Sequence, residues 1–254
     1  MTLADVLLLL AAGLAAGGVN ALAGGGSLIT YPALLLTGLP PVAANVSNSI
    51  SVCPGYLASV YGSRADLVGQ RRMAYELLPT TVVGTAIGCA ILLLTPARAF
   101  ELVVPFLVLA ATGTLAFQSR LRRVVGHPHD LSPGRQRAWL HLLAGVGAVY
   151  GGYFGAALGV ILVAVLALVR ADTMTRITAL KNLLSVTVGL VTAVVFGLFG
   201  PVNWVAVAVL TPATLAGGYL GALLVRRLPS ELLRWLIVGY GVVLGVWLLV
   251  DALA

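Results

Sequence analysis

Long apolar runs separated by short polar turns dominate the chain, and they predict membrane-spanning helices. No charged residue occurs from Val6 to Ser63, and Lys181 is the only one from Ile177 to Val225. About 20 apolar residues suffice to cross a bilayer as a helix. Six such helices are predicted, several with a proline at one end: Val42–Gly62, Tyr75–Leu94, Ala99–Phe117, Met174–Phe199, Val202–Val225 and Leu232–Val250.

Two longer apolar segments, Leu3–Leu36 and Ala138–Val169, are interrupted by glycine near the middle. A continuous helix over the first would be about 51 Å long, which is too long for a hydrocarbon core of about 30 Å. We therefore expect each segment to fold into a hairpin. The expected breaks are Gly24, Gly25 and Gly26 in the first hairpin, and Gly151, Gly152, Gly155 and Gly159 in the second.

The charge content excludes a soluble globular enzyme. Sixty per cent of the residues are hydrophobic and 9% are charged, whereas soluble domains average about 25% charged residues. The net charge of +7 comes mainly from basic residues in short loops, which indicates membrane orientation rather than nucleic-acid binding. The basic loops expected in the cytoplasm are Arg64–Arg72, Arg120–Arg137, Arg170–Arg176 and Arg226–Arg227.

The turns at 37–41 and 197–204 carry no charge, and Arg98 is offset by Glu101, so these turns are expected outside. The same alternation places Met1 outside. The N-terminal stretch MTLADVLLLL lacks the positively charged region of a signal peptide, so we expect it to be the first membrane element rather than a cleaved signal. The second long segment then begins and ends in the cytoplasm. An even number of crossings is needed there, which favours a hairpin over one long helix.

The chain repeats itself at a spacing of 134 residues, which becomes 133 after a one-residue gap. The matches fall on glycine, proline and asparagine, which apolar composition alone does not align. They include Gly17 with Gly151, Gly18 with Gly152, Asn48 with Asn182, Pro79 with Pro212, and Gly84 with Gly217.

The repeat divides the chain into a membrane half at 1–120, a basic cytoplasmic linker at 121–137 and a second membrane half at 138–254. The loop after Asn48 is expected inside, whereas the loop after Asn182 is expected outside. The predicted fold is thus an all-α polytopic membrane protein of two inverted repeats, each a glycine-broken hairpin plus three transmembrane helices. This plan is typical of secondary transporters, which bind substrate between the halves.

Lys181 is the most informative residue, because an ionisable side chain inside a membrane helix is costly and often functional. Together with Asn182, it is a candidate to attract and orient an anion. Asn45, Ser47 and Asn48 form the equivalent cluster in the first half, and their amides and hydroxyl can donate hydrogen bonds. The alternatives are a lysine that snorkels to the interface and polar groups that only join helices.

The glycine clusters Gly24–Gly26 and Gly151–Gly152 are candidates to expose backbone N–H groups at the N-termini of half-helices, where anions bind. Tight packing without a ligand is the alternative. Further residues that can line the same space are Asn20, Ser27, Thr30, Tyr31, Tyr150 and Tyr153.

Enzyme motifs are absent from the sequence. There is no HExxH, CxxC or P-loop spacing, and no pair of carboxylates lies within a span. Cys53 and Cys89 lack metal-type spacing and are expected to be small buried apolar residues. No enzymatic activity, cofactor or metal is predicted.

Two stretches carry a family resemblance that covers nearly the whole chain. AGGGSLITYPALLLTGLPPVAANVSNSIS resembles the first signature of the TauE/SafE sulfite/sulfonate exporters. VYGGYFGAALGVILVAVLALV, followed by RITALKNLLS, resembles the second. The resemblance implies a multi-pass transporter of the prokaryotic plasma membrane that exports sulfite, sulfoacetate and related sulfur anions. By motif position it implies functional roles for Gly24–Gly26, Pro32, Asn48, Gly151–Gly152, Lys181 and Asn182.

The expected function is transport of small anions such as sulfur oxyanions or organosulfonates, by ion-coupled alternating access. The expected partners are the anionic substrate and membrane lipid. A coupling proton or sodium ion and a homo-oligomer stay open, and no nucleic acid is expected. The alternatives are an uncoupled anion channel or facilitator and a membrane scaffold that transports nothing.

Overall fold

The computed structural model describes residues 1–22, 25–117, 132–169, 172–224 and 230–253, and every regular element among them is a helix, as predicted. In chain order the elements are α1 (Leu3–Leu22), α2 (Ser27–Leu36), α3 (Pro41–Gly62), the short 3₁₀ helix η1 (Arg64–Leu67), α4 (Arg71–Leu94), α5 (Ala97–Ala116), α7 (Pro133–Tyr153), α8 (Leu158–Val169), α9 (Met174–Phe199), α10 (Trp204–Leu224) and α11 (Ser230–Leu253).

The six apolar helices predicted from the sequence are present as α3, α4, α5, α9, α10 and α11. The α9 helix has the predicted ends. At its start, the Thr173 hydroxyl caps the helix by accepting a hydrogen bond from the Arg176 N–H. The α7 helix begins at Pro133, within the segment predicted as the linker 121–137. Proline is tolerated in the first helical turn, because the N–H that it lacks has no helical partner there.

Within the described residues, four stretches are long and apolar enough to cross a membrane by length and composition. They are Leu3–Asn20, Arg71–Leu94, Ala97–Ala116 and Thr175–Phe199. Apolar side chains are also widely exposed on the surface of the structure, such as Leu94, Leu198 and Phe199. An outer surface of this kind fits lipid as its solvent, since a soluble protein rarely exposes large apolar patches.

The first hairpin is broken where expected, and the second is broken at Gly155, one of the four glycines expected to break it. The α2 helix begins at Ser27, directly after Gly25 and Gly26, while Gly24 lies outside the described residues. The second break spans 154–157, where Gly155 has φ of +70° and Ala157 has φ of +54°.

The prediction that Gly151, Gly152 and Gly159 break the second hairpin was wrong. Gly151 and Gly152 lie in the last turn of α7, and Gly159 lies in the first turn of α8. Gly152 stays helical because α7 crosses α4 very closely there. A Cβ at this position would collide with the Thr85 carbonyl oxygen, and small residues permit such crossings in membrane proteins.

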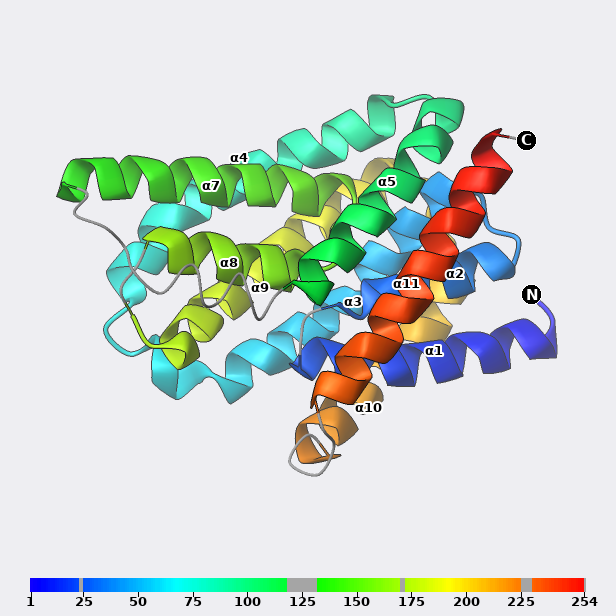
Figure 1. The fold of residues 1–254 in the computed structure, drawn as a ribbon, viewed down its shortest axis with the longest axis horizontal. Coiled ribbons are helices and arrows are strands. Elements are labelled where there is room, and N and C mark those ends of the chain that lie inside the picture. Colours follow the sequence, from blue (N-terminus) through cyan, green and yellow to red (C-terminus); the bar gives the residue numbers. More distant parts are fainter. Residues whose placement is uncertain (23–24, 118–131, 170–171, 225–229, 254) are drawn as a thin grey trace.

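The two hairpins point in opposite directions. Figure 1 shows α1 coming from one end of the molecule and α7 from the other, so that their tips meet near the middle. Helix packing follows the same correspondence: α1 lies against α10 as α4 lies against α7, and α3 lies against α10 as α9 lies against α4. The opposite membrane orientation of the two halves stays a prediction.

Glycine lies at both the α1–α10 crossing and the α4–α7 crossing. A Cβ at Gly17 would collide with the Thr214 carbonyl oxygen of α10, and a Cβ at Gly88 would collide with the Val149 carbonyl oxygen of α7. These glycines bring backbones close enough for extensive dispersion contact in a lipid environment, where apolar burial gives little driving force.

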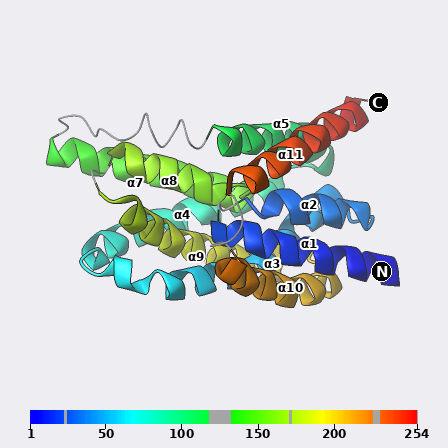
Figure 2. The same cartoon turned by 60° about the horizontal axis from the view of Figure 1, so that its bottom comes forward.

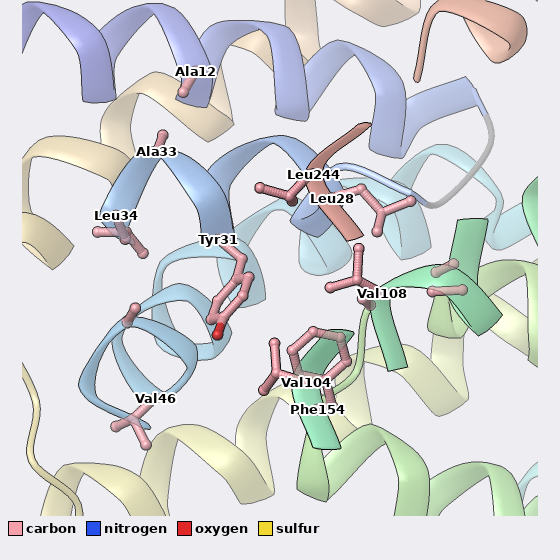
Figure 3. Close-up of a cluster of buried hydrophobic side chains, with 14 of the residues drawn as sticks. Ala12, Leu28, Tyr31, Ala33, Leu34, Val46, Val104, Val108, Phe154 and Leu244 are labelled. Atoms are coloured by element: carbon pink, nitrogen blue, oxygen red, sulfur yellow. The ribbon is translucent and has the colours of Figure 1, made fainter. Parts of the chain in front are cut away.

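Helices α5 and α11 pack against each other and lie across α2 and α8 (Figure 2). Beneath them, Val104, Val108 and Leu244 join Tyr31 and Phe154 in a buried apolar cluster (Figure 3). This cluster holds the hairpin tips in place. Cys53 and Cys89 are buried free cysteines, as predicted.

Candidate functional site

A pocket lies where the two hairpin breaks meet helices α3 and α9. The gaps between atoms there sum to about 270 Å³, open solvent included, but they leave room for only about one or two water molecules. Both predicted halves contribute to it. Its lining comprises Ser27 of α2; Ser49, Val52 and Tyr56 of α3; Gly151, Phe154, Gly155 and Leu158 around the second break; and Val188, Gly189 and Thr192 of α9.

The first wall is the N-terminus of α2. Ser27 is its first residue. The N-cap residue before it is Gly26, which has no side chain that could bond to the first N–H groups of the helix. The Gly26 N–H donates to the Asn20 side-chain oxygen at 2.8 Å, which ties the break back to α1. A helix N-terminus carries partial positive charge, so this wall is electrostatically suited to an anion.

Hydroxyl groups supply the polar character of the pocket, and none of the lining residues is charged. Hydroxyls donate hydrogen bonds to oxyanions and can also accept them. In this structure the Ser49 hydroxyl donates to the Asn45 carbonyl at 2.9 Å, and the Thr192 hydroxyl donates to the Gly189 carbonyl at 2.9 Å. The hydroxyl-bearing lining residues are Ser27, Ser49, Tyr56 and Thr192.

The second wall is the break between α7 and α8, which contacts from both halves hold in place. The Tyr150 hydroxyl donates to the Ala156 carbonyl at 2.7 Å. From the first half, the Asn45 side chain donates to the Tyr153 carbonyl at 2.9 Å. The Tyr31 ring meets Phe154 edge-on, with ring centroids 5.3 Å apart, a favourable aromatic geometry.

Two polar atoms close to this wall are buried without a hydrogen-bond partner within the described structure: the Tyr31 hydroxyl and the Asn45 side-chain oxygen. Tyr31 and Asn45 are each 1% exposed. Buried polar groups are nearly always satisfied, so unpaired ones often indicate an ordered water or a functional group.

The predicted cluster of Asn45, Ser47 and Asn48 flanks the pocket rather than lining it. All three residues are buried on α3. Asn48 accepts a hydrogen bond from the Thr30 hydroxyl of α2, and Ser47 accepts one from the Asn203 backbone N–H at 2.9 Å. These side chains therefore fix the position of neighbouring elements in this conformation.

Lys181 and Asn182 also lie outside the lining. Asn182 donates to the Ser63 hydroxyl at 3.0 Å and to the Ser59 carbonyl at 3.3 Å, at the end of α3. Lys181 is half-buried on α9. It precedes the lining residue Val188 by seven positions, about 10 Å along the helix axis.

Of the predicted glycines, Gly151 lines the pocket, while Gly25, Gly26 and Gly152 are buried beside the breaks. Ser27, named in the sequence among the residues that can line this space, does line it. Sequence reasoning did not single out Ser49, Tyr56 and Thr192 as candidates. Helical spacing offered a signal for all three: Thr192 lies eleven residues after Lys181 and Tyr56 eleven after Asn45, each about 20° around its helix, and Ser49 lies four residues after Asn45, about 40° around α3.

The sequence comparisons decide the family. A family model described as "Sulfite exporter TauE/SafE" matches residues 9–248. The chain belongs to the sulfite exporter TauE/SafE family. The predicted fold class and multi-pass membrane location agree with this membership, and a transporter rather than an enzyme is indicated.

Curated relatives of this TauE/SafE protein are named as transporters. One from Haemophilus influenzae, "Probable membrane transporter protein", is 28% identical over 237 residues, which cover 91% of this chain and 89% of the relative. "Probable membrane transporter protein YfcA" of Escherichia coli K12 is 28% identical over 244 residues, 93% of this chain and 87% of the relative. "Probable membrane transporter protein ORF9" of Sinorhizobium sp. is 23% identical over 243 residues, 93% and 89%. No solved structure matches this TauE/SafE chain.

Proposed function

We propose that the protein transports small anions of the sulfite and organosulfonate class, and that the anion binds in the pocket between the hairpin breaks. The observation that carries the proposal is the composition of this pocket. Broken helices from both halves meet there, and hydroxyls and a helix N-terminus face a common space. This is the arrangement in which secondary transporters hold anionic substrates.

The chemistry of the lining suits an oxyanion. Sulfite and sulfonate oxygens accept hydrogen bonds, and the hydroxyls of Ser27, Ser49, Tyr56 and Thr192 can donate them once those of Ser49 and Thr192 turn away from the helix carbonyls that they bond in this conformation. The partial positive charge at the start of α2 favours the anion. Lys181 adds a full positive charge from farther along α9, where it attracts the substrate without contacting it in this conformation.

A flux assay in proteoliposomes tests the proposal. We expect saturable, protein-dependent movement of sulfite, or of a sulfonate such as taurine or sulfoacetate, across the vesicle membrane. Absence of saturable flux and of ligand-induced thermal stabilisation for this whole class would contradict it, and would favour a membrane scaffold instead.

Paired variants locate the binding site. Thr192→Val keeps the side-chain shape but removes the hydroxyl from the pocket, so we expect a lower affinity for the anion, by about 2- to 10-fold for one net hydrogen bond. Thr187→Val is the matched control, because Thr187 lies on the same helix and is half-buried but does not line the pocket. Equal affinity in both variants would exclude this pocket as the binding site.

Ion coupling is tested in the same vesicles. Ion-coupled alternating access predicts that an imposed proton or sodium gradient drives accumulation of the anion. An uncoupled facilitator predicts flux that only dissipates the anion's own electrochemical gradient. This measurement distinguishes the two transport mechanisms, and its outcome does not bear on where the anion binds.

A further inference from the structure

At one end of the pocket, a loop of the first half is hydrogen-bonded to the start of α9. The Asn182 side chain donates to the Ser63 hydroxyl at 3.0 Å. The Arg176 guanidinium donates to the Val68 carbonyl at 3.0 Å, and the Gln70 side chain donates to the Arg176 carbonyl at 3.0 Å. We call these five residues the first interlock. Gln70 is only 2% exposed, whereas the hydrogen bond between Arg176 and Val68 lies at the surface.

At the other end, a loop of the second half is bonded to the start of α3. This loop, 200–203, joins α9 to α10. The Asn203 backbone N–H donates to the Ser47 hydroxyl at 2.9 Å. Gly200 packs so closely on α3 that a Cβ there would lie 3.0 Å from a Val46 methyl group. We call Val46, Ser47, Gly200 and Asn203 the second interlock.

The two interlocks occupy corresponding places in the repeat. In each, the loop after the third long element of one half contacts the beginning of the same element in the other half. Gln70 and Asn203 differ by 203 − 70 = 133 positions, which is the repeat offset in this region. Asn182 of the first interlock corresponds to Asn48, the neighbour of Ser47, at an offset of 182 − 48 = 134.

The pocket lies between the interlocks on both helices. Along α3, the lining residues Ser49 and Tyr56 fall between Ser47 and Ser63. Ser47 and Ser63 are 16 residues apart, which corresponds to about 24 Å of helix and turn. Along α9, the lining residue Thr192 similarly falls between Asn182 and Gly200. One interlock therefore lies beyond each end of the pocket along these helices.

We propose that these interlocks are the two gates of the transport cycle, each made of a loop from one half and a helix start from the other. The inference rests on the proposed transport function and goes beyond it by naming the moving contacts. Access from one side requires the interlock on that side to break while the other stays formed. Breaking either the first or the second interlock gives the two alternative states that alternating access needs.

This structure holds both interlocks formed, and the pocket is correspondingly tight. It leaves room for about one or two water molecules. A sulfonate group has four heavy atoms, so substrate requires the pocket to widen. Release of one interlock provides this widening, because α3 and α9 pack on each other and both line the pocket.

Cysteine pairs test the gates in the full-length protein. Ser63→Cys with Asn182→Cys places a disulfide or a short thiol cross-link across the first interlock, and Ser47→Cys with Asn203→Cys does so across the second. The background carries Cys53→Ala and Cys89→Ala and is first shown to transport like the wild type. The four single-cysteine variants, treated with the same reagent, are the controls.

We expect each cross-link to reduce flux at least 10-fold relative to the same double-cysteine protein after reduction with dithiothreitol. In each single-cysteine variant, the flux should be the same before and after treatment with the reagent. Cross-linked proteins that transport as fast as their reduced forms would overturn the inference.

A second readout does not depend on the substrate. In vesicles of known orientation, Ser49→Cys is labelled with a membrane-impermeant maleimide. We expect the first cross-link to restrict labelling to the side of Asn203 and the second to restrict it to the side of Ser63. The same sidedness with both cross-links would overturn the gates even when flux is present. Opposite sidedness without flux of any sulfur anion would instead contradict only the proposed substrate class.

Discussion

Neutralising Lys181 is predicted to weaken anion binding moderately, because the structure places its charge near the pocket but outside the lining. Val188 is the first α9 residue of the lining after Lys181, and the seven positions between them correspond to about 10 Å of helix. We therefore expect the lysine to act on a bound anion through space in this conformation, rather than as the direct ligand that its position in the sequence suggested.

Coulomb's law sets the size of the effect. Two unit charges about 10 Å apart interact by about 1.7 kcal/mol at an effective dielectric constant of about 20, and by about 0.4 kcal/mol in bulk water. The loss expected for Lys181→Met is thus a factor of about 2 to 20 in the dissociation constant. Truncating a lysine in direct, buried contact with the anion would cost about 2–5 kcal/mol or more, which raises the dissociation constant by about 30-fold or more.

Isothermal titration of the purified protein measures this difference. Methanesulfonate supplies a single negative charge, and dimethyl sulfone is a neutral analogue whose affinity should not change. Lys181→Arg keeps the charge and should bind methanesulfonate nearly as the wild type does. An unchanged dissociation constant in Lys181→Met would refute the electrostatic role, and a loss of 100-fold or more would refute the through-space geometry.

Substitutions at three further positions test the packing by thermal unfolding in detergent. Gly152→Ala should destabilise the protein by about 1–3 kcal/mol, because the new methyl group meets the Thr85 carbonyl at the α4–α7 crossing; wild-type stability would refute that close approach. Gly113→Ala is the matched control within helix α5, where no atom lies within 4 Å of an added Cβ, and it should be neutral or stabilising by up to about 1 kcal/mol. Thr173→Ala should cost about 1 kcal/mol through loss of the α9 cap, whereas Thr173→Ser should retain it.

The helical fold could be predicted largely from local signals. Apolar runs of membrane length fixed the existence of α4, α5 and α9, and prolines indicated where several helices begin. The hairpins followed from length alone, because segments of this size do not fit across a bilayer as single helices. The ion pair between Arg98 and Glu101, with an N–O distance of 3.8 Å, agrees with the expected charge balance in that turn.

The position of the second break shows where local signals failed. Several glycines compete in the stretch 151–159, and glycine can either bend a helix or let two helices touch. Gly152 serves the second purpose, against Thr85, while Gly155 adopts the positive φ that turns the chain. Only the presence of α4 beside α7 separates these roles, and a single sequence does not reveal that neighbour.

For the candidate site too, the residues named from the sequence differ from those that the structure places in the pocket. The sequence drew attention to Asn48, Lys181 and Asn182 because polar residues are conspicuous in apolar helices. In the structure, Asn48 and Asn182 hold elements together, while the less conspicuous hydroxyls of Ser49 and Thr192 line the pocket.

By itself, the sequence determined that this protein is helical and spans a membrane, because both properties depend on the composition and spacing of nearby residues. The matches at offsets of 133–134 positions were also visible without a structure, since they rest on residue identity rather than on contacts. The tertiary structure alone decided which polar groups share the pocket and which loops bond to α3 and α9 beyond its ends. Those relations join residues more than 100 positions apart, such as Ser47 with Asn203 and Ser63 with Asn182. They depend on how whole helices cross, and helix crossing is set by packing between elements rather than by local propensity.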